Sequence, residues 1–236
     1  TLFNCLEVQP NITSIIMPKC GHSSTFWPQL AVCLQSNTTL ELIITEEVMD
    51  ESFKKVTAAL KENSKSKLHS IYFLEAGTIN SSYAPLIASL FDAISIKLLG
   101  LYGGIKLSNL AIIFNTAKKY EKFNDLKRIE LESVSKGNPC ELLTSIPWLQ
   151  DLRILECDIN FNDVIKMAAD MNSLTSLRVK NVKSVSRPIP FTKLPETLDF
   201  ISITDSKIAS DILPSLMNIL LLHKTKSGKL DLVINS

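Results

Sequence analysis

The sequence lacks a charge bias and lacks a long uninterrupted apolar run. Its 236 residues include 25 Lys or Arg and 24 Asp or Glu, for a net charge of +1. This balance gives no reason to expect nucleic acid or an anionic membrane as a partner. The longest apolar stretch, residues 84–101, is interrupted by Asp92 and Lys97, so we expect no membrane span. A chain that is 45% hydrophobic can nevertheless bury a sizeable core.

The sequence also lacks the pattern of a disulfide framework. Its five cysteines are odd in number and include no C-x-x-C pair: Cys5, Cys20, Cys33, Cys140 and Cys157. Such unpaired cysteines are typical of a reducing compartment. The three N-glycosylation sequons, at Asn11, Asn37 and Asn80, are unremarkable in a chain rich in Asn, Ser and Thr. We therefore predict a cytoplasmic protein. No signal peptide is recognisable, but the chain starts at Thr1, so a processed leader stays open.

Motifs of catalysis and cofactor binding are missing as well. The chain contains no P-loop, G-x-G-x-x-G, H-E-x-x-H or G-x-S-x-G sequence. The basic segment 223–229, "HKTKSGK", is more typical of a solvated loop than of a phosphate site. We predict no catalytic residue, no cofactor and no metal site, and hence not an enzyme.

One spacing recurs along almost the whole chain. In "LQDLRILEC" (149–157) the first, fourth and sixth positions are apolar, and the same pattern repeats. The repeats start near residues 12, 40, 68, 96, 126, 149, 174, 198 and 230. Three intervals of 28 residues followed by intervals of 23 to 32 are very improbable in an arbitrary globular sequence.

These repeats resemble the leucine-rich repeat family, whose core L-x-x-L-x-L-x-x-N/C returns about every 20–29 residues. The 28-residue intervals are most similar to the ribonuclease-inhibitor-like, intracellular subclass, in which a helix follows each strand. The resemblance to actin-regulatory CARMIL-type repeat domains is weaker. The family implies an α/β solenoid, or horseshoe, with a concave parallel sheet and convex helices.

The residues between the strands agree with that architecture. Segments such as "DESFKKVTAALKE" (50–62) carry one apolar helical stripe, which a neighbouring repeat must cover. Three prolines in 184–197 instead predict an irregular, extended convex segment around residues 180–197. Because no polar linker interrupts the pattern, we predict a single domain over 1–236, taken from a longer repeat array.

The register changes the interpretation of the cysteines and histidines. Cys157 falls in the ninth position of its repeat, where a buried column of small and medium residues is expected, so a structural thiol is favoured over a reactive one. Cys140 lies between repeats and is expected to be the most exposed thiol. The histidines at 22, 69 and 223 belong to distant repeats, which speaks against a joint metal or catalytic site.

The third, fifth and seventh positions of each strand should point outward into the concave face. In the first four repeats they are mainly apolar, and in the fifth to seventh they carry charges of both signs. We predict partner-binding residues at Ile16, Leu42, Ile44, Tyr72, Leu74, Leu98, Tyr102, Arg128, Glu130, Arg153 and Arg178. The alternatives are a solvated, cross-paired charged half, and an apolar half covered by a segment outside this sequence or by a second copy of the chain.

The pattern therefore predicts a non-catalytic interaction module or scaffold that binds a protein partner on its concave face. The alternatives are an activator of a partner enzyme, of the GTPase-activating type, and the repeat portion of an innate sensor or ubiquitin-ligase substrate receptor. Fold resemblance alone does not decide among them. Homodimerisation stays open.

Overall fold

The computed structural model describes residues 11–17, 25–46, 50–181, 193–204, 213–223 and 225–235. Contacts within the chain divide it into two compact units, Thr1–Leu126 (unit 1) and Lys127–Ser236 (unit 2). Within each unit, parallel strands alternate with helical segments, and each strand pairs with its neighbours in chain order. The fold is thus the α/β leucine-rich repeat solenoid that the sequence predicts. That residues 1–236 form a single domain stays a prediction.

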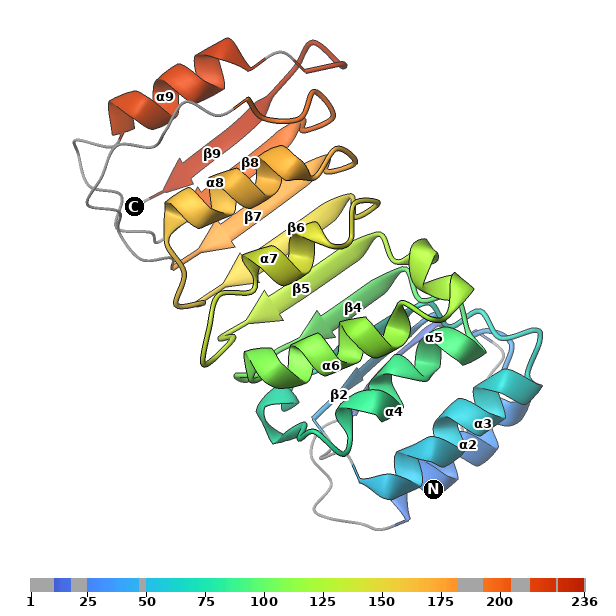
Figure 1. Cartoon of the computed structure of the whole chain (residues 1–236). Coiled ribbons are helices and arrows are strands. Elements are labelled where there is room, and N and C mark those ends of the chain that lie inside the picture. The colour runs from blue at the N-terminus through green and yellow to red at the C-terminus, as the bar shows by residue number, and fades with distance from the viewer. Residues whose placement is uncertain are drawn as a thin grey trace. The chain divides into compact units, whose positions relative to one another are not determined.

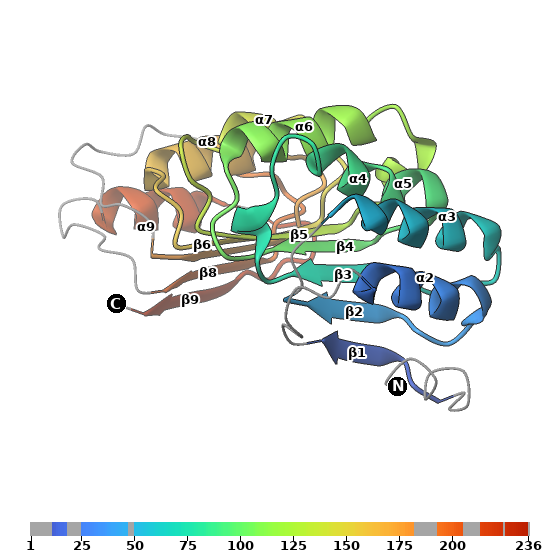
Figure 2. The ribbon, with the colours of Figure 1, turned by 90° about the horizontal axis from the view of Figure 1, so that it is seen from below.

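The described part of unit 1 forms a parallel sheet with helices on one of its faces (Figure 1). The strands are β1 (Ser14–Met17), β2 (Leu42–Thr45), β3 (Ser70–Phe73) and β4 (Leu98–Leu101). The α-helices are α2 (Phe26–Ser36), α3 (Lys54–Glu62), α4 (Ala84–Ala88), α5 (Leu90–Ala93) and α6 (Leu107–Ala117), with 3-10 turns η1 (Glu51–Phe53), η2 (Ala76–Thr78) and η3 (Glu121–Asp125). All five α-helices lie on one side of these strands (Figure 2). We call the other side the open face of unit 1.

The core of unit 1 follows the predicted register. The fourth positions of successive repeats pair directly, and all are buried: Ile15, Ile43, Ile71 and Leu99. Behind the sheet, aromatic rings interlock from helix to strand. Trp27 meets Phe53 edge to face at 4.8 Å, and Phe53 meets Phe73 at 6.0 Å. These contacts join α2 to the repeat that follows it, so α2 buries its apolar side chains against that next repeat.

Short polar side chains fix the ends of these helices. Asp50 accepts a hydrogen bond from the Ser52 N–H at 2.7 Å and caps the turn that leads into α3. The Asn63 amide donates to the carbonyls of Leu34 and Asn37 at the end of α2, at 2.8 and 2.6 Å. A buried amide from one repeat therefore satisfies the helix end of the repeat before it.

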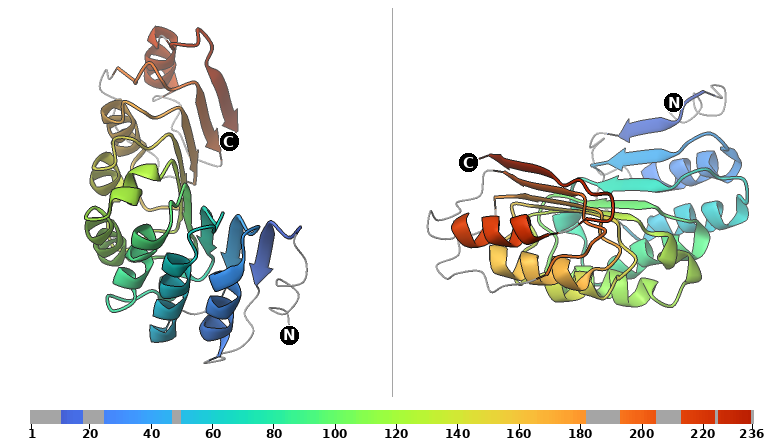
Figure 3. Two further views of the ribbon diagram at one scale, coloured as in Figure 1. Left: turned by 90° about the vertical axis from the view of Figure 1, so that its right-hand side faces the viewer. Right: turned by 90° about the horizontal axis from the view of Figure 1, so that it is seen from above.

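The described part of unit 2 repeats the arrangement with longer strands. They are β5 (Arg128–Glu132), β6 (Asp151–Leu155), β7 (Ser176–Lys180), β8 (Phe200–Thr204) and β9 (Asp231–Asn235). The α-helices are α7 (Cys140–Thr144), α8 (Phe161–Asp170) and α9 (Leu213–Leu222). Figure 3 shows from two further directions that these helices lie on one side of the strands. The other side is the open face of unit 2.

Part of the predicted convex segment lies outside the described residues, namely 182–192. Residues 193–199, which lead into β8, contain neither helix nor strand. The three prolines of 184–197 fall at 188, 190 and 195. Of these, Pro195 lies in the described, non-helical part, as expected.

The ninth repeat begins one residue earlier than predicted. Leu232 pairs with Ile201 and Ile234 with Ile203, so these two residues occupy the core columns, and Val233 falls in line with the open face. The prediction had the reverse assignment and was wrong, because shifting a strand by one residue exchanges its two faces. Leu232 and Val233 are both 37% exposed, so burial on this strand gives little preference to either face.

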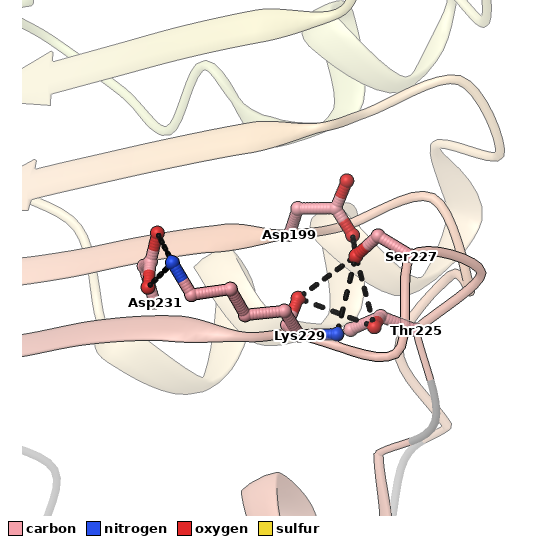
Figure 4. Close-up of polar contacts among 5 residues, drawn as sticks. All are labelled: Asp199, Thr225, Ser227, Lys229 and Asp231. Carbon is pink, nitrogen blue, oxygen red and sulfur yellow. Dashed lines mark hydrogen bonds and ion pairs between the residues drawn. The ribbon is translucent and has the colours of Figure 1, made fainter.

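A polar loop before β9 explains this register (Figure 4). The Ser227 hydroxyl donates to the Asp199 carboxylate at 2.8 Å, and the Asp231 N–H donates to the Asp199 carbonyl at 2.8 Å. Asp199 thereby holds both ends of the loop, and Gly228 supplies a left-handed residue, φ 73°, between them. Lys229 pairs with Asp231 at 3.1 Å. The described residues of the basic segment 223–229 thus form a structured loop, in keeping with the prediction of a solvated loop.

Candidate functional site: the open faces of units 1 and 2

The predicted apolar residues of the first four repeats all lie on the open face of unit 1. Ile16, Ile44 and Tyr72 follow one another in register across β1, β2 and β3, and Leu42 lies in the row beside them. Ile16 is 67% exposed, whereas the others are half-buried: Leu42, Ile44, Tyr72, Leu74, Leu98 and Tyr102. We call these seven residues the apolar patch.

Tyr72 occupies the centre of this patch because its neighbour in register is a glycine. Tyr72 pairs with Gly100 on β4, and a Cβ atom on Gly100 would lie 2.1 Å from Tyr72 Cδ1. The tyrosine ring therefore fills the space that any other residue at position 100 would need. Its centroid lies 5.9 Å from that of Tyr102, at a tilt of 43°. The two rings form a half-buried aromatic pair on the helix-free side of the sheet.

The turn after β4 is packed as closely as this aromatic pair. Gly103 has φ 83°, and a Cβ on it would lie 2.6 Å from the Leu74 carbonyl oxygen. The Ala76 N–H donates to the Tyr102 carbonyl at 2.7 Å. The backbone that carries Leu74 and Tyr102 is thus held by direct contact between consecutive repeats, which presents their side chains in a defined arrangement.

The open face of unit 2 carries charges that pair across neighbouring strands. Arg128 lies opposite Asp151 with their side chains 2.5 Å apart, and Glu130 lies opposite Arg153 at 3.2 Å. Glu130 is 2% exposed and Asp151 is 9% exposed. Directly opposed ion pairs of this kind stabilise a sheet, in agreement with the cross-paired alternative for this half. Glu130 was predicted as a partner-binding residue, but its carboxylate lies beneath Arg153, so a partner would meet the arginine first.

Arg178 differs from the other two arginines of this face. Its register neighbours are Arg153 on β6 and Ser202 on β8. The guanidinium carbon lies 4.9 Å from the centre of the Phe200 ring, a cation–π contact of about 0.5–1 kcal/mol at an exposed site. Its Nε–H is buried without a hydrogen-bond partner, which costs on the order of 1–3 kcal/mol. Sequence reasoning listed Arg178 without its aromatic neighbour, because Phe200 lies one repeat away.

All three described cysteines are buried, and for two of them, Cys157 and Cys33, the sequence predicted burial. Cys157 is buried, its Sγ accepts the Val134 N–H at 3.4 Å, and burial raises the pKa of its thiol. Cys33 is buried on α2. Cys140, the thiol expected to lie exposed in a loop, is instead buried as the first residue of α7, and burial raises its pKa from 9.0 to about 12. That prediction was wrong. Cys5 and Cys20 lie outside the described residues.

A further candidate site in unit 1 can be compared with these faces. A hollow of about 650 Å³ in unit 1 is lined by Lys61, Lys67, Lys97 and Lys122 among others. However, Lys61 pairs with Asp92 at 2.8 Å, and Lys122 donates to two carbonyls at the end of α5.

Within the described ranges, no three His, Cys, Asp or Glu residues come together as metal ligands would. The same part of the chain has no helix that is long and apolar enough to cross a bilayer.

Comparisons with known proteins find similarity among solved structures, at low identity. No family model matches the sequence, and no curated protein matches it either. Among solved structures, an internalin (InlF) from Listeria monocytogenes is similar, at 13% identity and a TM-score of 0.40 over 86% of this chain and 65% of that one. A leucine-rich repeat protein from Leptospira interrogans aligns at 12% identity and a TM-score of 0.30, over 82% and 62%. The chain therefore spans less than two thirds of the length of the solved structures it matches.

Proposed function

We propose that this chain is a non-catalytic protein-interaction module that binds a protein partner on its open faces, with the apolar patch of unit 1 as the main contact. The observation that carries the proposal is the Tyr72–Gly100 arrangement. A glycine in the interior of a strand destabilises it, yet here it seats an aromatic side chain that stays half-exposed on a face without helices. Half-exposed aromatic anchors among apolar neighbours are the usual composition of binding hot spots.

The charged face of unit 2, taken by itself, has the composition of the polar part of an interface. Its ion pairs are already formed within the chain, so a partner would find fixed charges rather than mobile ones. Charged groups at the edge of an interface contribute mainly to specificity and to the rate of association.

The test changes the patch within the full-length protein in its own cells. Tyr72→Glu combined with Leu98→Glu should abolish co-purification of the partner, because two carboxylates would have to be desolvated in the contact. The matched control is Val32→Glu with Ala58→Glu, which places the same charges at exposed positions on α2 and α3. If both double variants retain the same partners, the apolar patch is not the contact.

We further infer a cytoplasmic protein of the helix-bearing, ribonuclease-inhibitor-like subclass. Full helices such as α2, α3 and α6 in the repeats of 28 to 30 residues support the subclass. The free, buried thiols of Cys33, Cys140 and Cys157 support a reducing compartment. Kinship with CARMIL-type repeat domains and a role as a scaffold rest on the sequence resemblance. Fractionation of cells that express the tagged full-length protein tests the compartment, and recovery from the secreted fraction would contradict it.

A further inference from the structure

The fifth-position row on the open face of unit 2 has two guanidinium groups for one carboxylate. Along this row Glu130 lies opposite Arg153, Arg153 opposite Arg178, and Arg178 opposite Ser202. The single carboxylate, Glu130, is bonded to Arg153 at 3.2 Å. In the third-position row, by contrast, Arg128 and Asp151 match one to one. The third-position row also holds Asp231, which pairs with Lys229 at 3.1 Å, so within the described residues Arg178 is the charged side chain of these two rows that joins no ion pair.

Arg178 is held in place although no counter-charge neutralises it. Within the described ranges, no carboxylate of the chain lies within ion-pair distance of its guanidinium. The side chain rests on the Phe200 ring at 4.9 Å, and its Nε–H is already removed from solvent. Such a guanidinium has lost part of its hydration before any partner arrives, and its planar N–H groups are orientated by the aromatic surface.

We propose that Arg178 binds the side-chain carboxylate of an Asp or Glu residue on a protein partner, seated beside Phe200 and Ser202 on the open face of unit 2. This inference rests on the proposed function and names the chemistry of the partner at one position. A carboxylate accepts parallel N–H bonds from a guanidinium in one plane, which is the strongest pairing available to arginine. It also relieves the repulsion between Arg178 and Arg153.

The surrounding charges favour a single carboxylate over a polyanion. On β5 and β6 the same face carries three acidic side chains, Glu130, Glu132 and Asp151, together with Arg128 and Arg153. A nucleic acid or polyphosphate would bring several negative charges onto a surface whose other two arginines are already paired with carboxylates, whereas an isolated carboxylate places one charge on the arginine that has no such pair.

The experiment selects binders from a random peptide library displayed on phage, with three versions of the chain as bait. These are the unchanged chain, Arg178→Ala, and Lys166→Ala. The last is a matched control, because Lys166 is exposed on α8 and its removal changes the net charge equally. Peptides selected on the unchanged chain and on Lys166→Ala should share an Asp or Glu at one position. That preference should vanish on Arg178→Ala.

Synthetic peptides then measure the pair directly. Replacing the shared Glu by Gln should weaken binding to the unchanged chain at least tenfold and leave binding to Arg178→Ala within about twofold. Melting of the free chain shows whether Arg178→Ala folds, and we expect a melting temperature that is equal or higher, since one of two like charges on register neighbours is removed. Peptides without a shared acid, or an acidic preference that survives Arg178→Ala, would overturn the proposal.

The same selection separates failure of this inference from failure of the proposed function. Peptides that lose binding to Tyr72→Glu but not to Arg178→Ala would leave the interaction face in place and remove the carboxylate site. Peptides that bind the unchanged chain, Tyr72→Glu and Arg178→Ala equally well would place the binding site elsewhere and contradict both proposals. Inorganic phosphate that competes with the selected peptide more strongly than glutamate does would also overturn the assignment to a carboxylate.

Discussion

The two units build their open faces from opposite kinds of side chain. Unit 1 presents isoleucine, leucine and tyrosine at the third, fifth and seventh positions, while unit 2 presents arginine, glutamate and aspartate at the same positions. From β1 to β8 the fourth and sixth positions are buried and almost all apolar. The repeat fixes the core columns and leaves the open-face columns free to vary. Function in such a fold is therefore encoded in alternate residues of each strand.

The largest expected effect tests whether the charges of unit 2 contribute to folding or are merely solvated. Arg153→Ala should destabilise the chain by about 3 kcal/mol, because it leaves Glu130 buried without its guanidinium. Urea unfolding followed by circular dichroism measures the change. The control is Arg178→Ala, which removes an arginine from the next strand without breaking an ion pair. If the two variants have equal stability, the buried pair is not a structural element of this face.

Glu130→Leu in the Arg153→Met background sharpens the same comparison. An apolar pair of similar volume should restore most of the lost stability, because burying two charges has its own desolvation cost. The open face of unit 2 would then resemble that of unit 1 without unfolding. A double variant that is as unstable as Arg153→Ala would show that Glu130 has a further essential contact.

The second effect concerns the aromatic pair of unit 1. Gly100→Ala should cost about 1–3 kcal/mol, because its Cβ would overlap Tyr72 and force the ring out of its seat. In the Tyr72→Ala background the same substitution should be nearly neutral. The coupling between the two changes, measured by urea unfolding in a double-mutant cycle, is the test. If the effects of the two substitutions on the free energy of unfolding are additive, the position of the Tyr72 ring does not depend on the absence of a side chain at Gly100.

The third effect concerns Cys140, one of the two described thiols of unit 2, and its response to pH. The folded chain keeps the Cys140 proton up to about pH 12, whereas the unfolded chain releases it near 9.0. The free energy of unfolding should therefore be unaffected by this thiol below pH 9 and fall above it. The expected slope is about 1.4 kcal/mol for each unit of pH. Urea midpoints between pH 8 and 10.5 should fall more steeply for the unchanged chain than for Cys140→Ala. Parallel slopes would contradict burial of this thiol.

The spacing of apolar residues was sufficient to predict the core of this fold. The one-four-six pattern placed Ile43, Ile71, Leu152 and Leu177 in buried columns, and the pairing register agrees. It also assigned Cys157 to a buried position. These predictions succeeded because a parallel strand in every repeat forces equivalent residues into one row.

The failures occurred where contacts within a loop or between side chains decide the outcome. The apolar run around Val233 fits two registers equally well, and the Asp199 hydrogen bonds that select one of them cannot be read from periodicity. Cys140 follows Pro139 in a segment without a helical pattern, yet the short helix α7 buries it. The packing of Arg178 on Phe200 depends on a diagonal contact between strands, which the sequence alone does not single out.

The smallest expected effect compares the residue that follows a strand in each unit. The eighth repeat position is left-handed in both: Gly103 has φ 83° in unit 1, and Glu156 has φ 53° in unit 2. A side chain in this conformation costs on the order of 1 kcal/mol, so Glu156→Gly should stabilise the chain by about 0.5–1 kcal/mol. Gly103→Ala should have the opposite sign and a larger size, because its Cβ would also meet the Leu74 carbonyl. Thermal melting of both variants is the measurement. A destabilising Glu156→Gly would mean that the exposed glutamate makes a contact worth more than the strain it imposes.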